Sequence, residues 1–200
     1  MQEYYTHKQK RIKIWIDETS EIPSYKGDMV EHQQKRDAGN LGQKDIVMEF
    51  SMPMNFSNYG CLGVKYIPSQ TGSLKIGINS KAEWGPILEG RLSFNKGCVS
   101  LGINSEYVDV MMKYIMLSGE INKIPSGELI FYTGAYSEVG SSLMTYLISI
   151  EILLRLLLSD NCNFSEKEIE DLMSLSITTS SEQFKGLKER GYEEITCSKI

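Results

Sequence analysis

The side chains that most often carry covalent chemistry are few and scattered in this sequence. His7 and His32 are its only histidines, so a pair in which a histidine takes the proton from a serine or cysteine nucleophile is hard to assemble. Ser137 stands next to Glu138, but adjacent side chains in a turn point apart, and no base is identified for this serine. The sequence therefore predicts no catalytic residues, and we expect a protein that is not an enzyme.

Metal and nucleotide sites need clusters of residues that the sequence does not contain. Its four cysteines, Cys61, Cys98, Cys162 and Cys197, lie far apart, whereas a structural zinc site needs close-set Cys or His pairs. The same spacing favours reduced, mostly buried thiols over a disulfide framework. No G-x-x-x-x-G-K-[ST] motif occurs, so there is no P-loop to hold nucleotide phosphates. We expect no metal, no cofactor and no bound GTP or ATP.

Composition indicates a globular protein. The 200 residues are 41% hydrophobic and 24% charged, which is enough for one good core. A formal net charge of −5 argues against indiscriminate binding to nucleic acid, although a local basic patch remains compatible with it. The N-terminus lacks the apolar stretch of a signal peptide, and the most apolar run, Leu143 to Leu158, is too short and too polar to span a bilayer. These features predict a cytoplasmic protein without membrane contact.

The first half of the chain has the two-residue period of β-strands. Ile12, Ile14 and Ile16 alternate with polar or amphipathic residues, which predicts a half-buried strand. The polar stretch 17–45 is too long for a plain connection, so we expect a further strand within it near 29–35. Four more strands are expected between turn residues, at 46–52, 62–67, 74–78 and 98–103.

Helical periodicity begins near residue 105. Asn104 or Ser105 is placed to cap a helix that ends near Gly119, and a strand at 129–133 leads into a loop ending at Gly140. Ser141 or Ser142 then opens a long helix that is apolar nearly all round, so we expect it to be largely buried.

The C-terminal part predicts a shorter helix from Ser165, with Glu168 completing a capping box, and a loosely held polar end from Thr178. Strands early and helices late predict an α+β two-layer sandwich with the helices on one face of the sheet. We expect one domain over 1–159 and a helical extension, partly loose, over 160–200.

Three stretches resemble domain IV of elongation factor G, in the same order and at similar spacing. The first contains Pro23-Ser-Tyr25-Lys26, His32-Gln33-Gln34, Gly39-x-x-Gly42-Gln43 and Asp45-Ile-Val-Met-Glu49-Phe50, where the family has P-x-Y-R, H-K-K-Q-S-G-G-x-G-Q and D-V-V-I-E-F. The second is Glu106-Tyr107-Val108, where the family has E-Y-I. The third and most specific is Gly134-Ala-Tyr136-Ser137-Glu138-Val139-Gly-Ser141-Ser142, which matches G-S-Y-H-D-V-D-S-S.

The resemblance, which covers roughly residues 20 to 157, implies a ribosomal protein S5 domain 2-like fold without the GTPase domain. That fold contains a left-handed βαβ crossover, contrary to the usual rule. The resemblance also implies a non-catalytic interaction module that contacts the ribosome, RNA or a protein partner through two tip loops lying side by side. The implied contact residues are Arg36, Asp37, Gly39, Gly42, Gln43, Gly134, Tyr136, Ser137 and Glu138.

The sequence departs from the family at these tips. Ser137 stands where the family has a histidine, and Arg36-Asp37-Ala38 stands where the family is basic and glycine-rich. Such divergence fits a changed task as well as a lost one, so it leaves open whether ribosome binding survives.

Another interpretation stays open on the residues alone. The segment 134–140 also fits a tight strand-to-helix turn with Tyr136 packed on its own domain, and 35–44 fits a solvated hairpin connection. The chain is then a structural protein that self-associates through the helix at 143–158 or an exposed strand edge. The basic run from His7 to Lys13 resembles a nucleic-acid patch, but Arg11 and Lys13 also fit the outer face of a strand.

Overall fold

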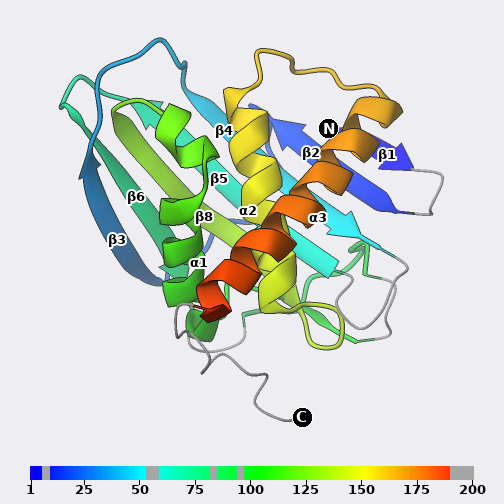
Figure 1. The fold of residues 1–200 in the computed structure, drawn as a ribbon. Coiled ribbons are helices and arrows are strands. Elements are labelled where there is room, and N and C mark those ends of the chain that lie inside the picture. The colour runs from blue at the N-terminus through cyan, green and yellow to red at the C-terminus, as the bar shows by residue number, and fades with distance from the viewer. Residues whose placement is uncertain (6–9, 53–58, 82–84, 94–96, 190–200) are drawn as a thin grey trace.

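A computed structural model describes residues 1–5, 10–52, 59–81, 85–93 and 97–189 (Figure 1). Within these ranges the strands are β1 (Gln2–Tyr5), β2 (Arg11–Ile16), β3 (Asp28–Lys35), β4 (Lys44–Ser51), β5 (Tyr59–Pro68), β6 (Ser73–Ser80), β7 (Val99–Leu101) and β8 (Gly127–Ser137). The α-helices are α1 (Ser105–Leu117), α2 (Leu143–Leu158) and α3 (Glu166–Glu189), and a 3₁₀ turn, η1, covers Glu120–Lys123.

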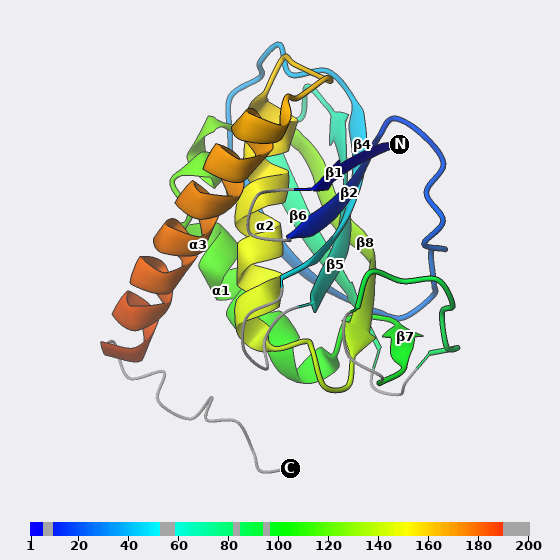
Figure 2. The same ribbon diagram turned by 90° about the vertical axis from the view of Figure 1, so that its right-hand side faces the viewer.

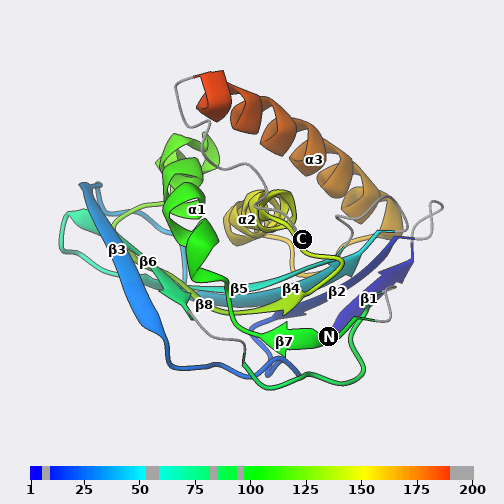
Figure 3. The same cartoon turned by 90° about the horizontal axis from the view of Figure 1, so that it is seen from below.

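The strands form one mixed sheet in the order β1-β2-β4-β5-β8-β6-β3, with β7 added beside the end of β8. All pairs are antiparallel except β6 with β8. The three α-helices lie on one face of this sheet (Figure 3). The predicted α+β class and the one-sided helix layer are therefore confirmed.

Strand alternation decides which side chains face the helices. Ile46, Met48 and Phe50 of β4 point into the main core under the helices, while Val47 points to the opposite face. The central strands are buried on both faces because irregular segments cover part of the sheet's other side. The predicted strands within the described residues are confirmed, with shifted ends. The sequence did not predict β1, because its four residues are too few and too polar to show a period.

The connection from β6 through α1 to β8 has an unusual hand. In Figure 1, β6 runs downward, α1 runs upward in front of the sheet, and β8 runs downward to the right of β6. This path is a left-handed crossover, whereas about 98% of such connections are right-handed. In the chain, α1 precedes β8 and α2 follows it, and both helices lie on the same face of the sheet.

Capping side chains set the start of the first two helices. The Asn104 side chain accepts a hydrogen bond from the Glu106 amide at the start of α1, as expected. At the start of α2, the Ser142 amide donates to the Thr145 hydroxyl at 3.1 Å, and the Thr145 amide donates to the Ser142 carbonyl at 3.0 Å. Nearly every residue of α2 is buried, which confirms the prediction from its apolar composition.

The last helix differs from the expectation. We predicted a short helix and a loosely held end from Thr178, but α3 continues to Glu189. It crosses α2 on the side away from the sheet (Figures 2 and 3). Ser176 and Ser180 are fully buried in this contact, and such small side chains allow close approach of the helices. Two serines in a polar segment gave no apolar period, which is why the contact was missed. Residues 190–200 lie outside the described ranges.

A buried carboxylate joins the three helices. Glu151 of α2 accepts hydrogen bonds from Tyr114 and Ser118, at 3.3 and 3.2 Å, and from the Arg155 guanidinium Nε at 3.0 Å. Tyr114 also shares a hydrogen bond with Ser180 of α3. The buried charge is thus paired and solvated by protein groups, as buried charges must be. In the described part of the chain, no helix is long and apolar enough to cross a membrane.

We predict that Ile150→Ala or Leu154→Ala lowers the free energy of unfolding by about 2–5 kcal/mol, because each leaves a cavity in a fully buried helix. Urea denaturation measures the loss. Leu175→Ala, on the exposed side of α3, is the control and should change stability by less than about 0.5 kcal/mol. A loss below about 1 kcal/mol for both core variants would contradict the burial of α2.

Candidate functional site

The end of β8 is a buried turn and not an exposed tip. Gly134, Tyr136 and Ser137 belong to the strand itself, and Ser137 is fully buried. The Ser137 amide donates to the Ser141 hydroxyl, and the Ser141 hydroxyl donates to the Tyr59 carbonyl. Ser137 also lies 3.3 Å from the Ser93 hydroxyl. The predicted exit loop is therefore shorter than expected, and Ser137 holds the turn into α2.

Little of this turn can contact a partner. Tyr136 is half-buried and packs against the main core, so only part of its side chain is open to a partner. Glu138 and Val139 are exposed, but neither Gly134 nor Ser137 is. The interpretation of 134–140 as a strand-to-helix turn with Tyr136 packed on its own domain agrees with the structure.

The segment 36–43 lies at the opposite end of the sheet. β3 ends where β6 begins, at the pair Lys35 and Ser73, and the parallel strand β8 begins at that same end, with Gly127 beside Leu74. Ser137 lies at the far end of β8. The two predicted tips are thus separated by the length of β8, and the expectation that they lie side by side is wrong. The short sequence motifs located each segment along the chain but contained no information about the direction of the strands between the two segments.

This segment is also not a hairpin connection, because β3 and β4 are not paired. It crosses the end of the sheet from the outer strand β3 to β4, over the strands between them (Figure 1). The Arg36 guanidinium donates to Asn122 at 2.8 Å, and the Asp37 carbonyl accepts from the Ser126 amide. A side chain at Gly39 would meet the Pro125 ring at 2.7 Å. Gly42 and Gln43 remain exposed.

Lys44, at the end of this crossing, is engaged within the protein. Its ammonium donates to the Leu157 carbonyl at 2.9 Å and to the Ser159 carbonyl, which are free acceptors at the C-terminus of α2. Of the cations expected to attract phosphate, Lys35 and Arg36 therefore remain, and Asp37 lies beside them. The positive charge that the basic run at 7–13 can offer to a phosphate is also smaller than its sequence suggests, since Lys10 is buried and Arg11 pairs with Glu3. His7 and Lys8 lie outside the described residues.

A buried polar cluster on the helix-free face was not predicted. The Glu49 carboxylate is fully buried and accepts from the Tyr59 hydroxyl at 2.9 Å and the Leu92 amide at 2.8 Å. The Arg91 guanidinium lies 3.7 Å from its other oxygen and also pairs with Glu21. The sequence feature that could have predicted this cluster is Glu49 itself, a charged residue among the apolar residues of β4.

This cluster holds the structure together and does not form a reaction site. Burial raises the pKa of the Cys61 thiol and of the Tyr59 hydroxyl, so both stay protonated near neutral pH. A buried neutral thiol is a poor nucleophile and has no access to substrate. Glu49 instead holds the chain at Arg91 and Leu92 against the helix-free face of the sheet, through the Leu92 amide and the Arg91 guanidinium. Over the described residues, no group of three or more His, Cys, Asp or Glu is placed to hold a metal ion.

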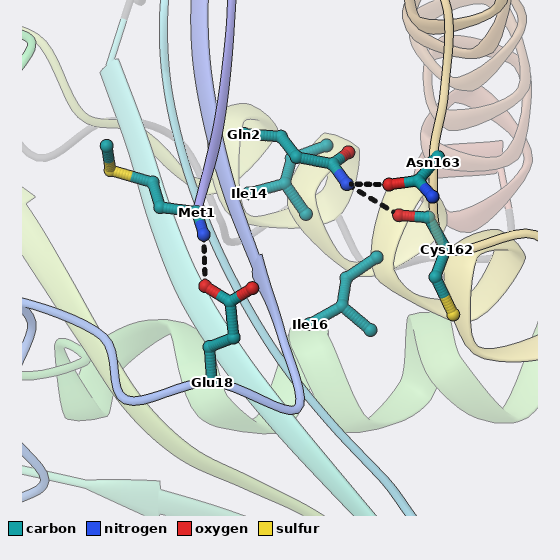
Figure 4. Close-up of a pocket in the computed structure, with 7 residues that line it drawn as sticks. All are labelled: Met1, Gln2, Ile14, Ile16, Glu18, Cys162 and Asn163. Carbon is teal, nitrogen blue, oxygen red and sulfur yellow. Dashed lines mark hydrogen bonds and ion pairs between the residues drawn. The ribbon is translucent and has the colours of Figure 1, made fainter.

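A small pocket lies between β1, β2 and the chain before α3 (Figure 4). Its volume is about 100 Å³, well below the roughly 300 Å³ of small ligand sites. The Gln2 amide group spans it and donates to the Cys162 carbonyl at 2.7 Å and to Asn163 at 2.9 Å. These contacts tie the loop before α3 to the sheet, so the pocket is part of the fold.

Within the described residues, β3 is an edge strand of the sheet. It pairs with β6 alone, lies at the outer margin of the sheet, and most of its side chains are exposed (Figures 1 and 3). The other edge strand, β1, has only four residues. An edge strand presents amides and carbonyls that lack a neighbouring strand.

Comparisons with protein-family models, curated proteins and solved structures find no match for this chain.

We predict that Glu49→Ala lowers the free energy of unfolding by about 3 kcal/mol or more, since it leaves the buried Tyr59 and Leu92 donors without their acceptor and removes one of the two carboxylates paired with Arg91. Glu49→Gln keeps one acceptor oxygen and should lose less. Urea denaturation is the measurement, with Glu128→Ala on the exposed part of β8 as control. Equal effects of Glu49→Ala and Glu128→Ala would show that the cluster contributes nothing to stability.

Proposed function

We propose that this chain is a non-catalytic interaction module that binds an extended segment of a protein along the free edge of β3. The observation that carries the proposal is an eight-residue edge strand paired on one side only. In strand addition of this kind, main-chain hydrogen bonds supply affinity and alternate side chains supply selectivity.

We also propose that the fold is ribosomal protein S5 domain 2-like, as in domain IV of elongation factor G. The left-handed β6–α1–β8 crossover supports this assignment, because few α+β folds contain one. The helices on a single face of the sheet agree with it, whereas the separation of segments 36–43 and 134–140 by the length of β8 does not. A fold of this kind hosts more than one function, so the contact surface has to be argued from the site.

The geometry favours a protein partner over RNA. RNA binding through the paired tips needs two adjacent exposed loops, and here the loops lie at opposite ends with Ser137 buried. On the remaining segment, 36–43, Arg36 is held by Asn122 and Asp37 repels phosphate. The β3 edge requires no basic patch, because its affinity comes from the backbone.

Proline scanning tests the proposed edge at single-residue resolution. The Arg36 amide donates to the Gly72 carbonyl, which continues the β3–β6 ladder, so the backbone groups of even-numbered β3 residues point to β6. Those of Met29, Glu31, Gln33 and Lys35 point outward. Gln33→Pro should therefore keep the fold and block strand addition, whereas His32→Pro removes a ladder hydrogen bond and should cost about 3 kcal/mol.

We predict that decapeptides selected from a random phage-displayed library on the wild-type protein bind Gln33→Ala as well as wild type. The same peptides should bind Gln33→Pro at least tenfold more weakly, which fluorescence anisotropy measures directly, because one or two main-chain hydrogen bonds are lost. Circular dichroism confirms that each variant is folded.

Two outcomes oppose this proposal. Selected peptides that bind Gln33→Pro and wild type equally place the contact away from the edge. Cosedimentation with ribosomes at low salt that is lost in Arg36→Glu and unchanged in Gln33→Pro would assign the function to RNA contact through 36–43 instead. Tyr136→Ala serves there as the test of the predicted tip, and we expect it to affect stability and not pelleting.

A further inference from the structure

We propose that the segment added to β3 is the β3 strand of a second copy of this chain, paired antiparallel about a two-fold axis at Gln33. The inference rests on the proposed use of the β3 edge and names its occupant. It places Glu31 of each copy directly opposite Lys35 of the other. The result is one continuous sheet through both copies, with both helix layers on the same face.

Backbone direction restricts the registers available to such a pair. In an antiparallel ladder, directly opposite residues either both point their amides and carbonyls at each other or both point them away. The outward residues of β3 are Met29, Glu31, Gln33 and Lys35, so an outward residue must stand opposite another outward residue. A two-fold axis can then pass through residue 31, 32, 33 or 34 but not between two residues. This excludes the register in which Asp28 faces Lys35.

Charge then selects among the permitted registers. With the axis at Glu31, two carboxylates face each other, which is destabilising. With the axis at His32, Glu31 faces Gln33 and Lys35 faces Met29, and with the axis at Gln34, Lys35 faces Gln33, so neither register matches opposite charges within the strand. With the axis at Gln33, Glu31 faces Lys35 twice by symmetry, and His32 faces Gln34. The Gln33 register is the one in which the strand's own charges complement each other.

The side chains involved are exposed and lie on one face. Glu31 pairs with Lys75 at 2.7 Å, and Gln33 donates to the Ser73 hydroxyl at 2.9 Å, which places both on the helix-free face of the sheet. Glu31 keeps a second carboxylate oxygen for a cation from another copy. Lys35 makes no ion pair with the described residues. On the same face, Gly77 has no side chain, and the Met29 thioether lies close above it.

The charges on this edge also explain why the pairing is selective. Charged side chains on an edge strand oppose indiscriminate association, because most registers set like charges together or leave charges unmatched. About six main-chain hydrogen bonds form in the Gln33 register, through the pairs 31 with 35, 33 with 33 and 35 with 31. Such an edge is small for an interface, so we expect a dimer whose formation depends on concentration.

Charge exchange between two variants tests the register. Glu31→Lys alone sets lysine against lysine, and Lys35→Glu alone sets glutamate against glutamate. An equimolar mixture of the two variants restores both opposite pairs. Sedimentation equilibrium of the full chain should show a dimer for the wild type, at least about tenfold weaker association for each variant alone, and association near wild type for the mixture. Gln33→Pro should be monomeric and Gln33→Ala dimeric.

Circular dichroism and urea denaturation of each variant separate loss of pairing from loss of fold, since the Glu31–Lys75 pair is exposed and contributes little. A dimer that persists in Gln33→Pro, or a mixture that associates no better than its components, overturns the inference. A wild type that stays monomeric also overturns it, while peptides that still distinguish Gln33→Pro from Gln33→Ala would leave the proposed function standing.

Discussion

The burial of α2 on all its sides is the constraint on which the rest of the structure depends. One side of the helix packs on the sheet and the other is covered by α3, so all of its leucines and isoleucines except Leu158 are buried. A helix of this composition would expose a large apolar stripe if either layer were absent. The polar residues within it are satisfied locally, as the Ser149 hydroxyl donates to the Thr145 carbonyl and Glu151 is bound by three side chains. This covering by α3 also removes self-association through α2, one of the two routes that the sequence left open.

Placing every helix on one face leaves the other face of the sheet to irregular chain. There, Trp15, Ile22, Tyr59 and Leu101 form a second, smaller core with the segments that cover β4 and β5. The buried Glu49 adds to that core by accepting a hydrogen bond from the Leu92 amide and by an ion pair with Arg91. This second core contains no residue of β3, which forms one edge of the sheet.

Local pattern was sufficient to predict most elements but not their relative placement. The period-two strands, the Asn104 cap and the apolar α2 follow from nearest-neighbour chemistry, and each was predicted within a few residues. The serines at the α2–α3 contact and the glutamate in β4 could not be assigned from pattern, because their roles exist only once another segment is packed against them. The prediction of the contact surface was wrong for a related reason. Whether two loops share an end of a sheet depends on the directions of the strands between them, and a motif gives a residue's neighbours in sequence without giving that direction.

Strand order explains why the motif at 36–43 exists in a protein that has no paired tips. β3 is the outermost strand and β4 lies on the far side of β6, β8 and β5, so the chain after Lys35 has to cross the ends of three strands. It does so in close contact with Pro125 and Ser126, where Gly39 fits because a side chain there would overlap the proline ring. Gly39 is therefore accounted for by the tight crossing, whereas a side chain at Gly42 would meet nothing within 4 Å. The same crossing sends the chain straight from β3 to the middle of the sheet, so no hairpin partner returns beside β3, and its outer amides stay available to another strand.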